Sequence, residues 1–346
     1  MRFNTSAVVV HWRLLTIGLW VLLGTALVPP VARAEVSEVR LARQLGLGYL
    51  QFYIMQDQKL VEKQAKALGL GDITASYKAL GTPTALMDVL LSASVDIVGV
   101  GLPGFLTMWD RTQQAAVKVL GVVALNRQPA YLLTRKPGIT TIKDYTDADR
   151  IALPAPKVSV QAIMLQMIAE KQLGAGRHTA LDHLTLSMSH PDGTTAMLGG
   201  KSEITSHFTS APFQYQQLQT KEIRKVLSSY DATDGPNTFS VAATTSQWRE
   251  ANPITYKAVM AAFLEANQFI VQNPRRAAEI FVTLDNAKTP VDFIEQMIKD
   301  PEFSYDAAPM NVLKIQHFMQ RTGSLKKKPD TWMEMFFPEV HGLKGS

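Results

Sequence analysis

Residues 73–100 read ITASYKALGTPTALMDVLLSASVDIVGV and contain a complete strand–helix–strand unit. Ile73 to Leu80 alternates apolar and polar residues, which is typical of a strand with one buried face. The pair Thr82-Pro83 suits the cap and first turn of a helix that ends near Leu91. Val95 to Val100 reads as a buried strand of the kind found in parallel sheets. This unit predicts two parallel strands joined by a helix.

The same pattern continues on both sides of this unit. Further strands are expected at Val39–Ala42 and Val117–Leu125, and further helices at Leu50–Leu68 and from Gly101 to about Trp109. Because strands and helices alternate regularly, the first part of the chain predicts a parallel sheet with helices on both faces.

A second set of elements follows without a low-complexity linker. We expect strands at Ala130–Thr134, Ile151–Leu153, Leu184–Met188, Ile204–Phe208, Ile223–Leu227 and Phe239–Ala243, and helices at Val158–Leu173, Thr194–Leu198 and Phe213–Leu218. Beyond about residue 246 the chain reads as helical, over Ile254–Val271, Arg275–Thr283, Thr289–Lys299 and Ala308–Thr322. Asn252-Pro253 and Asn273-Pro274 favour helix starts, with asparagine as cap and proline in first position. A chain of this length suits two cores better than one.

Residues 1–34 have the features of a secretory signal peptide. A basic start with Arg2 and Arg13 precedes the uncharged, mostly apolar run Leu14–Val28, and Ala32-Arg33-Ala34 offers the small residues that a signal peptidase needs. The apolar run is short for a membrane span, although a retained anchor is the alternative interpretation. We expect cleavage near Ala34. Loss of the three arginines lowers the formal charge from +5 to +2, which argues against nucleic-acid binding.

The chain contains no cysteine. Disulfides, thiolate catalysis and cysteine-ligated metals are therefore excluded, and so is a bacterial lipoprotein anchor. An exported protein without an anchor diffuses freely, so we expect a periplasmic location.

Several short motifs follow one another in a familiar order. They are Gln44-x-Gly46-x-Gly48-Tyr49, Gly81-Thr82-Pro83, Leu91–Asp96, Gly101–Gly104, Ile151–Pro154, Val158–Gln161, Ser187–Asp192, His207–Phe213 and Phe336–Glu339. In order and spacing the chain resembles the nitrate/sulfonate/taurine-type substrate-binding proteins of bacterial ABC importers. The resemblance covers essentially the whole mature chain, although no single motif decides it.

The resemblance implies an α/β fold, a two-lobed periplasmic binding protein of type II. Each lobe would be a Rossmann-like parallel sheet with one antiparallel crossover strand, followed by a helical C-terminal extension. Lobe 1 would comprise residues 35–126 and 238–346, and lobe 2 residues 127–237, with hinges near 127–131 and 237–241. It further implies a monomer without cofactor that delivers a small solute to an inner-membrane ABC permease.

The loops between strand ends and helix starts are the candidate ligand site. Ligands of α/β sheets bind beyond the carboxyl ends of the strands, where helix-start amides favour anions. We expect contacts from Gln44, Gly46, Gly48, Tyr49, Gly81, Thr82, Leu102, Pro103, Asn126, Ser159, His190, Ser210 and Phe213. Structural alternatives remain for several of them. The glycine loops can be ordinary turns, Thr82 and Ser159 can be plain helix caps, and Phe213 can belong to the core.

Two alternatives concern the segment His190-Pro191-Asp192. Either His190 contacts the ligand, or Asp192 caps the following helix while His190 packs across the cleft. The charge of the solute is also open, because the strand-end loops contain no clear arginine. Arg43 directly precedes Gln44 and Arg127 lies at the first hinge. We favour a small organic anion such as a sulfonate or taurine, or nitrate. An aromatic carboxylate or a thiamine-pyrimidine precursor is the alternative.

Other classes of function fit the sequence less well. His178, His183, His190 and His207 lie close in sequence but match no metal-binding motif. No Gly-x-Ser-x-Gly elbow is present, and we expect no enzymatic activity. A sensor-input protein that presents its ligand to a membrane kinase would bind in the same way as an importer component.

Overall fold

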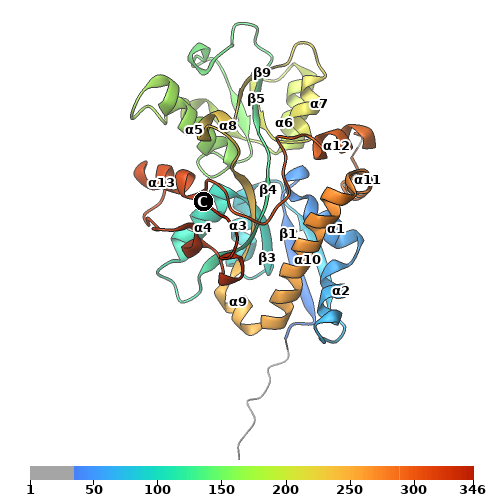
Figure 1. The fold of residues 1–346 in the computed structure, drawn as a ribbon. Coiled ribbons are helices and arrows are strands. Elements are labelled where there is room, and N and C mark those ends of the chain that lie inside the picture. The colour runs from blue at the N-terminus through green and yellow to red at the C-terminus, as the bar shows by residue number, and fades with distance from the viewer. Residues whose placement is uncertain (1–34, 288) are drawn as a thin grey trace, which may run out of the picture. The chain divides into compact units, whose positions relative to one another are not determined.

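The computed structural model describes residues 35–287 and 289–346, which form one compact unit. The predicted signal peptide therefore lies outside the described residues. The unit is built on two five-stranded sheets, each flanked by helices (Figure 1). None of the helices in these two ranges combines the length and the apolar character that crossing a bilayer requires.

The first sheet has the strand order β2-β1-β3-β10-β4. Its strands are β1 (Glu38–Arg43), β2 (Thr74–Ala79), β3 (Ile97–Gly101), β4 (Val119–Arg127) and β10 (Thr238–Thr245). β1 pairs in parallel with both β2 and β3, as the strand–helix–strand pattern predicts. β10 runs antiparallel between β3 and β4. A strand from late in the chain thus completes the sheet that the N-terminal part begins.

The second sheet has the order β7-β6-β8-β5-β9. Its strands are β5 (Tyr131–Thr134), β6 (Ile151–Leu153), β7 (Thr185–Ser187), β8 (Ser206–Thr209) and β9 (Arg224–Ser228). β6 is parallel to β7 and β8, whereas β5 is antiparallel to β8 and β9. Each sheet therefore contains one antiparallel crossover strand, which confirms the expected two-lobed α/β architecture.

The helices largely follow the sequence pattern. They are α1 (Leu50–Asp57), α2 (Leu60–Ala67), α3 (Pro83–Leu91), α4 (Leu102–Thr112), α5 (Val160–Leu173), α6 (His190–Gly199), α7 (Phe213–Leu218), α8 (Tyr230–Thr233), α9 (Ser246–Ala251), α10 (Pro253–Gln272), α11 (Pro274–Leu284), α12 (Val291–Ile298) and α13 (Val312–Arg321). The prediction of a single helix over Leu50–Leu68 was wrong. The chain breaks it at Lys59, which adopts a left-handed conformation with φ 50°, so that two shorter helices fold back on the sheet.

Three helix starts differ from expectation. Asp192 does not cap a helix at Thr194, because α6 begins at His190 and Ser189 accepts the cap hydrogen bond from Asp192 N. Neither Asn252 nor Asn273 caps its helix with its side chain. At α10 the carboxylate of Glu35 takes that role, accepting hydrogen bonds from Ile254 N and Thr255 N. A residue more than two hundred positions earlier in the chain thus supplies the cap, which no local pattern can reveal.

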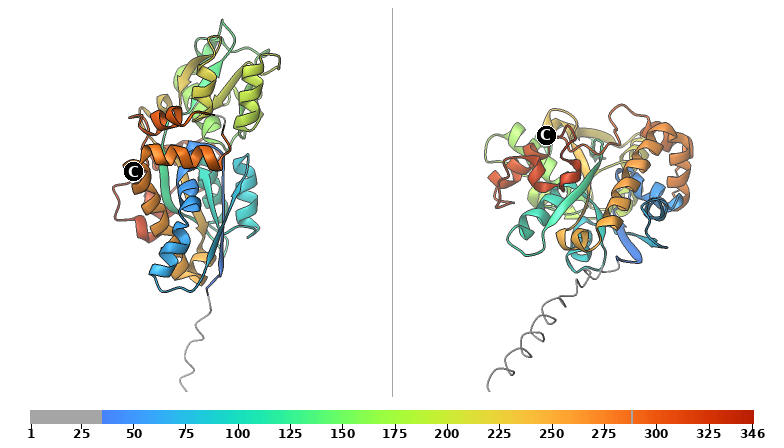
Figure 2. Two further views of the ribbon diagram at one scale, coloured as in Figure 1. Left: turned by 90° about the vertical axis from the view of Figure 1, so that its right-hand side faces the viewer. Right: turned by 60° about the horizontal axis from the view of Figure 1, so that its bottom comes forward.

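The C-terminal helices extend from the first sheet to the second. Figure 1 shows α12 and α13 at opposite sides of the junction between the sheets, and the views of Figure 2 agree. Arg321 on α13 forms a two-point ion pair with Glu170 on α5, with N–O distances of 2.5 and 3.1 Å. On the other side, Gln216 on α7 donates to Thr289 Oγ1, just before α12, at 2.5 Å.

Candidate functional site

A small enclosed cavity lies between the two lobes, where the strands of both sheets end. Its volume is about 10 Å³, roughly the space that one water molecule needs. Its walls come from both sheets and are formed by Gln44, Leu45, Tyr49, Pro83, Gly101, Ser159, Val160, Gln161, His190, Ser210 and Phe239. The carboxyl ends of parallel strands are where α/β folds bind their ligands.

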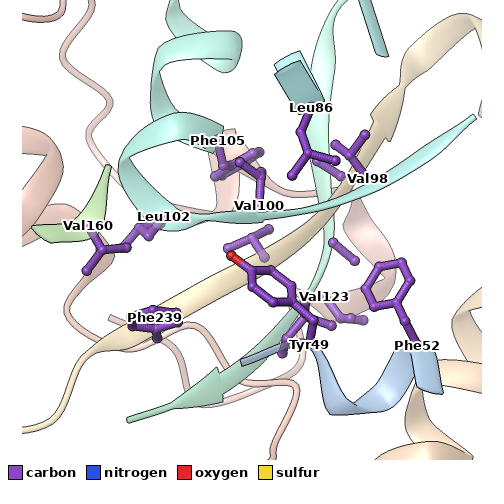
Figure 3. Packing of buried hydrophobic residues seen from close by; sticks show 14 of the residues in the cluster. Tyr49, Phe52, Leu86, Val98, Val100, Leu102, Phe105, Val123, Val160 and Phe239 are labelled. Atoms are coloured by element: carbon purple, nitrogen blue, oxygen red, sulfur yellow. The ribbon is translucent and has the colours of Figure 1, made fainter. Parts of the chain in front are cut away.

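The lobes touch each other around this cavity. Leu47 N donates a hydrogen bond to Ala211 O at 3.0 Å, which joins the loop after β1 to the loop after β8. On the other side, a Cβ added to Gly101 would lie 2.9 Å from Val160 Cγ2. Figure 3 shows Val160, at the start of α5, beside Leu102 at the start of α4. Glycine at position 101 is therefore what lets the two helix starts approach so closely.

The first lobe contributes a fixed pair of polar side chains. Tyr49 donates its hydroxyl hydrogen to Gln44 Oε1 at 2.9 Å, and both side chains are buried. Burial raises the pKa of the Tyr49 hydroxyl far above its usual value, so that it stays protonated. Because the carbonyl end of Gln44 is occupied, its amide NH₂ is the end available to a ligand.

The start of α5 contributes hydrogen-bond donors from the second lobe. Ser159 caps the helix by accepting from Ala162 N at 3.2 Å, as the sequence predicts. The first turn of the helix carries Gln161, which is 2% exposed and lines the cavity. Within the described residues its Nε2 has no hydrogen-bond partner. An unpaired buried donor costs roughly 1–3 kcal/mol, so a ligand atom that accepted from Gln161 would be strongly favoured.

His190, at the start of α6 in the second lobe, also lines the cavity and is held in place on three sides. Its Nδ1 lies 2.9 Å from Thr209 Oγ1, and its Nε2 lies 3.3 Å from Ser210 Oγ. Its ring stacks on Phe213 with a centroid distance of 5.5 Å. Complete burial lowers the pKa of His190 to about 3. The imidazole is therefore neutral at neutral pH and acts as a hydrogen-bonding group rather than a cation.

The walls of the cavity, all of them described residues, contain no lysine or arginine. Arg43 turns away and places its guanidinium 3.4 Å from the ring centroid of Tyr53. Arg127 forms an ion pair with Asp306. Positive potential at the cavity therefore comes from helix starts, where unpaired backbone amides and the helix dipole favour negative charge.

Comparison with known proteins identifies the architecture. No protein-family model and no curated protein sequence matches the chain. Among solved structures, the alkanesulfonate-binding protein of Xanthomonas axonopodis pv. citri bound to MOPS is similar with a TM-score of 0.68 and 16% identity, covering 85% of this chain and 96% of that one. The periplasmic nitrate-binding protein of Synechocystis PCC 6803 is similar with a TM-score of 0.67 and 16% identity. That match covers 87% of this chain and 84% of the other. The periplasmic aliphatic sulphonate-binding protein of Escherichia coli is similar with a TM-score of 0.64 and 15% identity. That match covers 87% of this chain and 98% of the other.

The chain has the fold of the sulfonate- and nitrate-binding periplasmic proteins. This confirms the resemblance seen in the motif order. In this chain, the cavity is lined by residues that follow strands of both sheets.

The cavity brings together five of the residues expected to bind ligand, which are Gln44, Tyr49, Ser159, His190 and Ser210. Three others hold the lobes together or cap helices at the rim. Gly46 lies against Ala211 O, Gly81 lies near Ser189, and Thr82 caps α3 by accepting from Ala85 N.

The remaining expected residues lie outside the cavity wall. Leu102 is fully buried in the core, and Pro103 accepts from Thr107 through its carbonyl. Gly48 and Asn126 meet at Ser240, whose hydroxyl hydrogen-bonds both of them. Phe213 lines a separate groove behind His190.

The predicted contact set lacked six of the wall residues, which are Leu45, Pro83, Gly101, Val160, Gln161 and Phe239. The signal for Gln161 was its place in the first turn of α5, two residues after the cap. Leu45 and Phe239 are apolar and carry no such signal. Of the four histidines near each other in sequence, only His190 and His207 lie close together, with ring centroids 5.8 Å apart. His183 pairs with Asp147 at the surface, and within residues 35–287 and 289–346 no three histidine or acidic side chains are placed to hold a metal ion.

Proposed function

We propose that this protein is the periplasmic solute-binding component of an ABC importer and captures a small anion in the cavity between its lobes. The observation that carries the proposal is the enclosed cavity at the strand ends of both sheets, with neutral hydrogen-bond donors from each lobe. The similar solved proteins that bind sulfonate and nitrate support the same role.

The lobes of this proposal are residues 35–126 with 238–346, and residues 127–237. The chain crosses between the sheets from β4 to β5 and again from β9 to β10, so that hinges near 127–131 and 237–241 would allow one lobe to rotate against the other. Solute contacts from both lobes would then favour the closed arrangement. The closed form would dock on the inner-membrane permease.

In this proposal, the cavity holds an anion without a positively charged side chain in its wall. Gln44, Gln161 and the helix-start amides of α5 donate hydrogen bonds, and the α5 dipole supplies the favourable field. These donors suit taurine, small sulfonates and nitrate in kind. Because the cavity as described has space for about one water molecule, the two lobes would stand further apart around such a solute. A solute in the cavity would give Gln161 Nε2 the hydrogen-bond partner that it lacks within the described residues.

A thermal-shift screen tests the proposal directly. The mature protein would be melted with taurine, methanesulfonate, nitrate, benzoate, a thiamine-pyrimidine precursor and a set of neutral and cationic solutes. At one hundred times Kd, a ligand adds about 2.7 kcal/mol to stability, and we expect an anion to raise Tm by several degrees. Stabilisation by cationic or neutral solutes alone would contradict the proposed anion.

Export is tested separately. Expression in a Gram-negative host followed by osmotic shock should release a protein whose intact mass corresponds to a start at Glu35. Retention of the full-length chain in the membrane fraction would contradict a free periplasmic protein.

A further inference from the structure

The hydroxyl groups around His190 determine which of its ring nitrogens carries the hydrogen. Because burial lowers the pKa of His190 to about 3, the imidazole is neutral, and one nitrogen donates a hydrogen bond while the other accepts one. The partner of each nitrogen decides between these two tautomers. Nδ1 lies 2.9 Å from Thr209 Oγ1, and Nε2 lies 3.3 Å from Ser210 Oγ. His190 and Ser210 line the cavity, whereas Thr209 lies behind the ring and can act on the cavity only through it.

A hydrogen on Nδ1 would leave a buried donor without a partner. In that tautomer Nδ1 donates to Thr209 Oγ1, and the hydroxyl hydrogen of Thr209 requires another acceptor. The Thr209 side chain is fully buried and makes no other hydrogen bond within the described residues. A buried donor that lacks an acceptor would lower the population of this tautomer by roughly 5- to 150-fold.

A hydrogen on Nε2 removes this conflict. Thr209 then donates its hydroxyl hydrogen to Nδ1, and Nε2 donates towards Ser210 Oγ. The hydroxyl hydrogen of Ser210 remains free to point into the cavity that this residue lines. The contact of 3.3 Å between Nε2 and Ser210 Oγ is long for a hydrogen bond, so a stronger acceptor in the cavity can also receive the hydrogen of Nε2.

We propose that Thr209 is a positioning residue, which holds His190 in the Nε2–H tautomer and thereby makes it a hydrogen-bond donor to the solute. This inference rests on the proposed function and deepens it. His190 and Ser210 then add two donors to the amide donors of the cavity wall, and an anion that can only accept hydrogen bonds matches such a wall. All three residues belong to the second lobe, so the assignment does not depend on how far apart the lobes stand.

A second buried histidine provides an internal reference. Gln217 Nε2 lies 3.0 Å from Thr194 Oγ1 and 2.9 Å from His207 Nδ1. Thr194 donates its own hydrogen to His190 O, so its oxygen accepts from the Gln217 amide. The same amide nitrogen donates to His207 Nδ1, which is therefore an acceptor. His207 thus also carries its hydrogen on Nε2, independently of Thr209.

Nitrogen NMR of the empty protein tests the assignment. In protein labelled with nitrogen-15 at pH 7, the chemical shifts of the ring nitrogens distinguish a protonated nitrogen from an unprotonated one. We expect His190 and His207 both to show a protonated Nε2 and an unprotonated Nδ1, and His190→Gln identifies the signals of His190 by their loss. A protonated Nδ1 at His190 would overturn the inference. Because no solute is present, this outcome is independent of the proposed function.

Three variants test the role of Thr209. Thr209→Val removes the hydroxyl group and keeps the branched shape, so that each tautomer of His190 leaves Nδ1 without a partner. We expect a mixture, with intermediate shifts at both nitrogens of His190 and unchanged shifts at His207. Thr209→Ser should restore the single tautomer. Thr134→Val is the matched control, because Thr134 is an equally buried threonine of β5 whose hydroxyl donates to Thr205 O. A single Nε2–H tautomer that persists in Thr209→Val would remove Thr209 from this role.

Calorimetric titration with nitrate connects the tautomer to binding. The fraction of protein in the donor tautomer scales the apparent affinity, so Thr209→Val should weaken nitrate binding by roughly twofold to threefold. Thr209→Ser and Thr134→Val should bind nitrate like the unaltered protein. Equal affinity in Thr209→Val despite a mixed tautomer would show that His190 does not donate to the solute. If nitrate binds to none of these proteins, the proposed nitrate site and the donor role fail together, while the NMR spectra still decide the tautomer.

Discussion

At the scale of single residues, one side chain of the cavity wall has a polar atom without a partner among the described residues. It is Gln161, whose Nε2 is buried and unpaired. Such a group destabilises the free protein and becomes favourable when a ligand accepts its hydrogen bond. Affinity and stability should therefore respond in opposite directions when this amide is removed.

We expect Gln161→Leu to weaken binding of the stabilising anion by roughly 10- to 100-fold, because a hydrogen bond to a charged group contributes about 1.5–3 kcal/mol. The Tm of the free protein should stay the same or rise. Calorimetric titration and melting of the same samples measure both. Gln172→Leu, at the exposed end of the same helix, is the control. Unchanged affinity in Gln161→Leu would remove this residue from the site.

The buried histidine makes stability depend on pH. Burial lowers the pKa of His190 from 6.5 to about 3, so between these values the unfolded chain binds a proton that the folded chain does not. The free energy of unfolding then falls as pH decreases from about 6.5 towards 3, and the full stability is present above 6.5. The neighbouring His207, whose ring lies 5.8 Å away, is shifted in the same direction by burial.

His190→Gln should therefore flatten the dependence of Tm on pH between pH 7 and 4. Part of the slope should remain because His207 still titrates. Melting curves in a series of buffers of equal ionic strength measure the difference between the variant and the unaltered protein. Parallel pH profiles for the two proteins would show that His190 is not the group responsible.

At the scale of elements, the starts of α4 and α5 set how closely the lobes approach. Gly101 has φ −58°, which any residue adopts, so an added methyl group meets no backbone strain and clashes with Val160 across the cleft. Overpacking by one methyl costs about 1–3 kcal/mol. If the lobes rotate apart as proposed, the two residues separate, and this cost would fall on the closed arrangement alone.

Gly101→Ala should accordingly weaken solute binding by roughly 5- to 100-fold with little change in the Tm of the free protein. Gly101→Ala with Val160→Ala should recover most of the affinity, since the second change removes the clashing methyl. Titrations of the two single variants and the double variant give the coupling energy. Additive losses in the double variant would argue against a clash across the cleft.

The sequence allowed most elements to be predicted because their signals are local. Strand–helix alternation and the Thr82 and Ser159 caps depend on residues within one turn. The break at Lys59 was missed because nothing in its neighbours requires a left-handed residue. The cap of α10 was misassigned because Glu35 comes from a distant part of the chain. Within the site, residue types indicated polar loops, but whether Leu102 or Gln161 faces the cavity depends on how the helix packs, which one sequence does not reveal.

At the scale of the whole molecule, α13 links the proposed lobes by charge on the outer surface. Arg321 pairs with Glu170, and Lys314 donates to Thr233 O at 2.7 Å and to Asp234 at 3.1 Å. Exposed ion pairs contribute about 0.2–1 kcal/mol each and are screened by salt. In the proposed hinge motion they would bias the lobes towards the closed arrangement only modestly.

Arg321→Gln should weaken solute affinity by roughly twofold to fivefold at low salt, although the residue is remote from the cavity. Glu170→Gln should have the same effect, and the double variant should lose no more than either single variant. Arg275→Gln, which breaks ion pairs within one lobe, is the control. The difference in solute affinity between these variants and the unaltered protein should vanish at high ionic strength. A loss of affinity that does not depend on salt would exclude an electrostatic link.

The position of β10 between β3 and β4 also determines the order in which this protein can acquire structure during synthesis. The two N-terminal strands that it joins have no hydrogen bonds to each other in the sheet order. A ribosome must therefore produce the whole second lobe, and then residues 238–245, before the first sheet can close. Glu35 likewise can form its hydrogen bonds to the amides of residues 254 and 255 only after those residues have been synthesised. Nascent chains shorter than this should remain protease-sensitive in their first lobe.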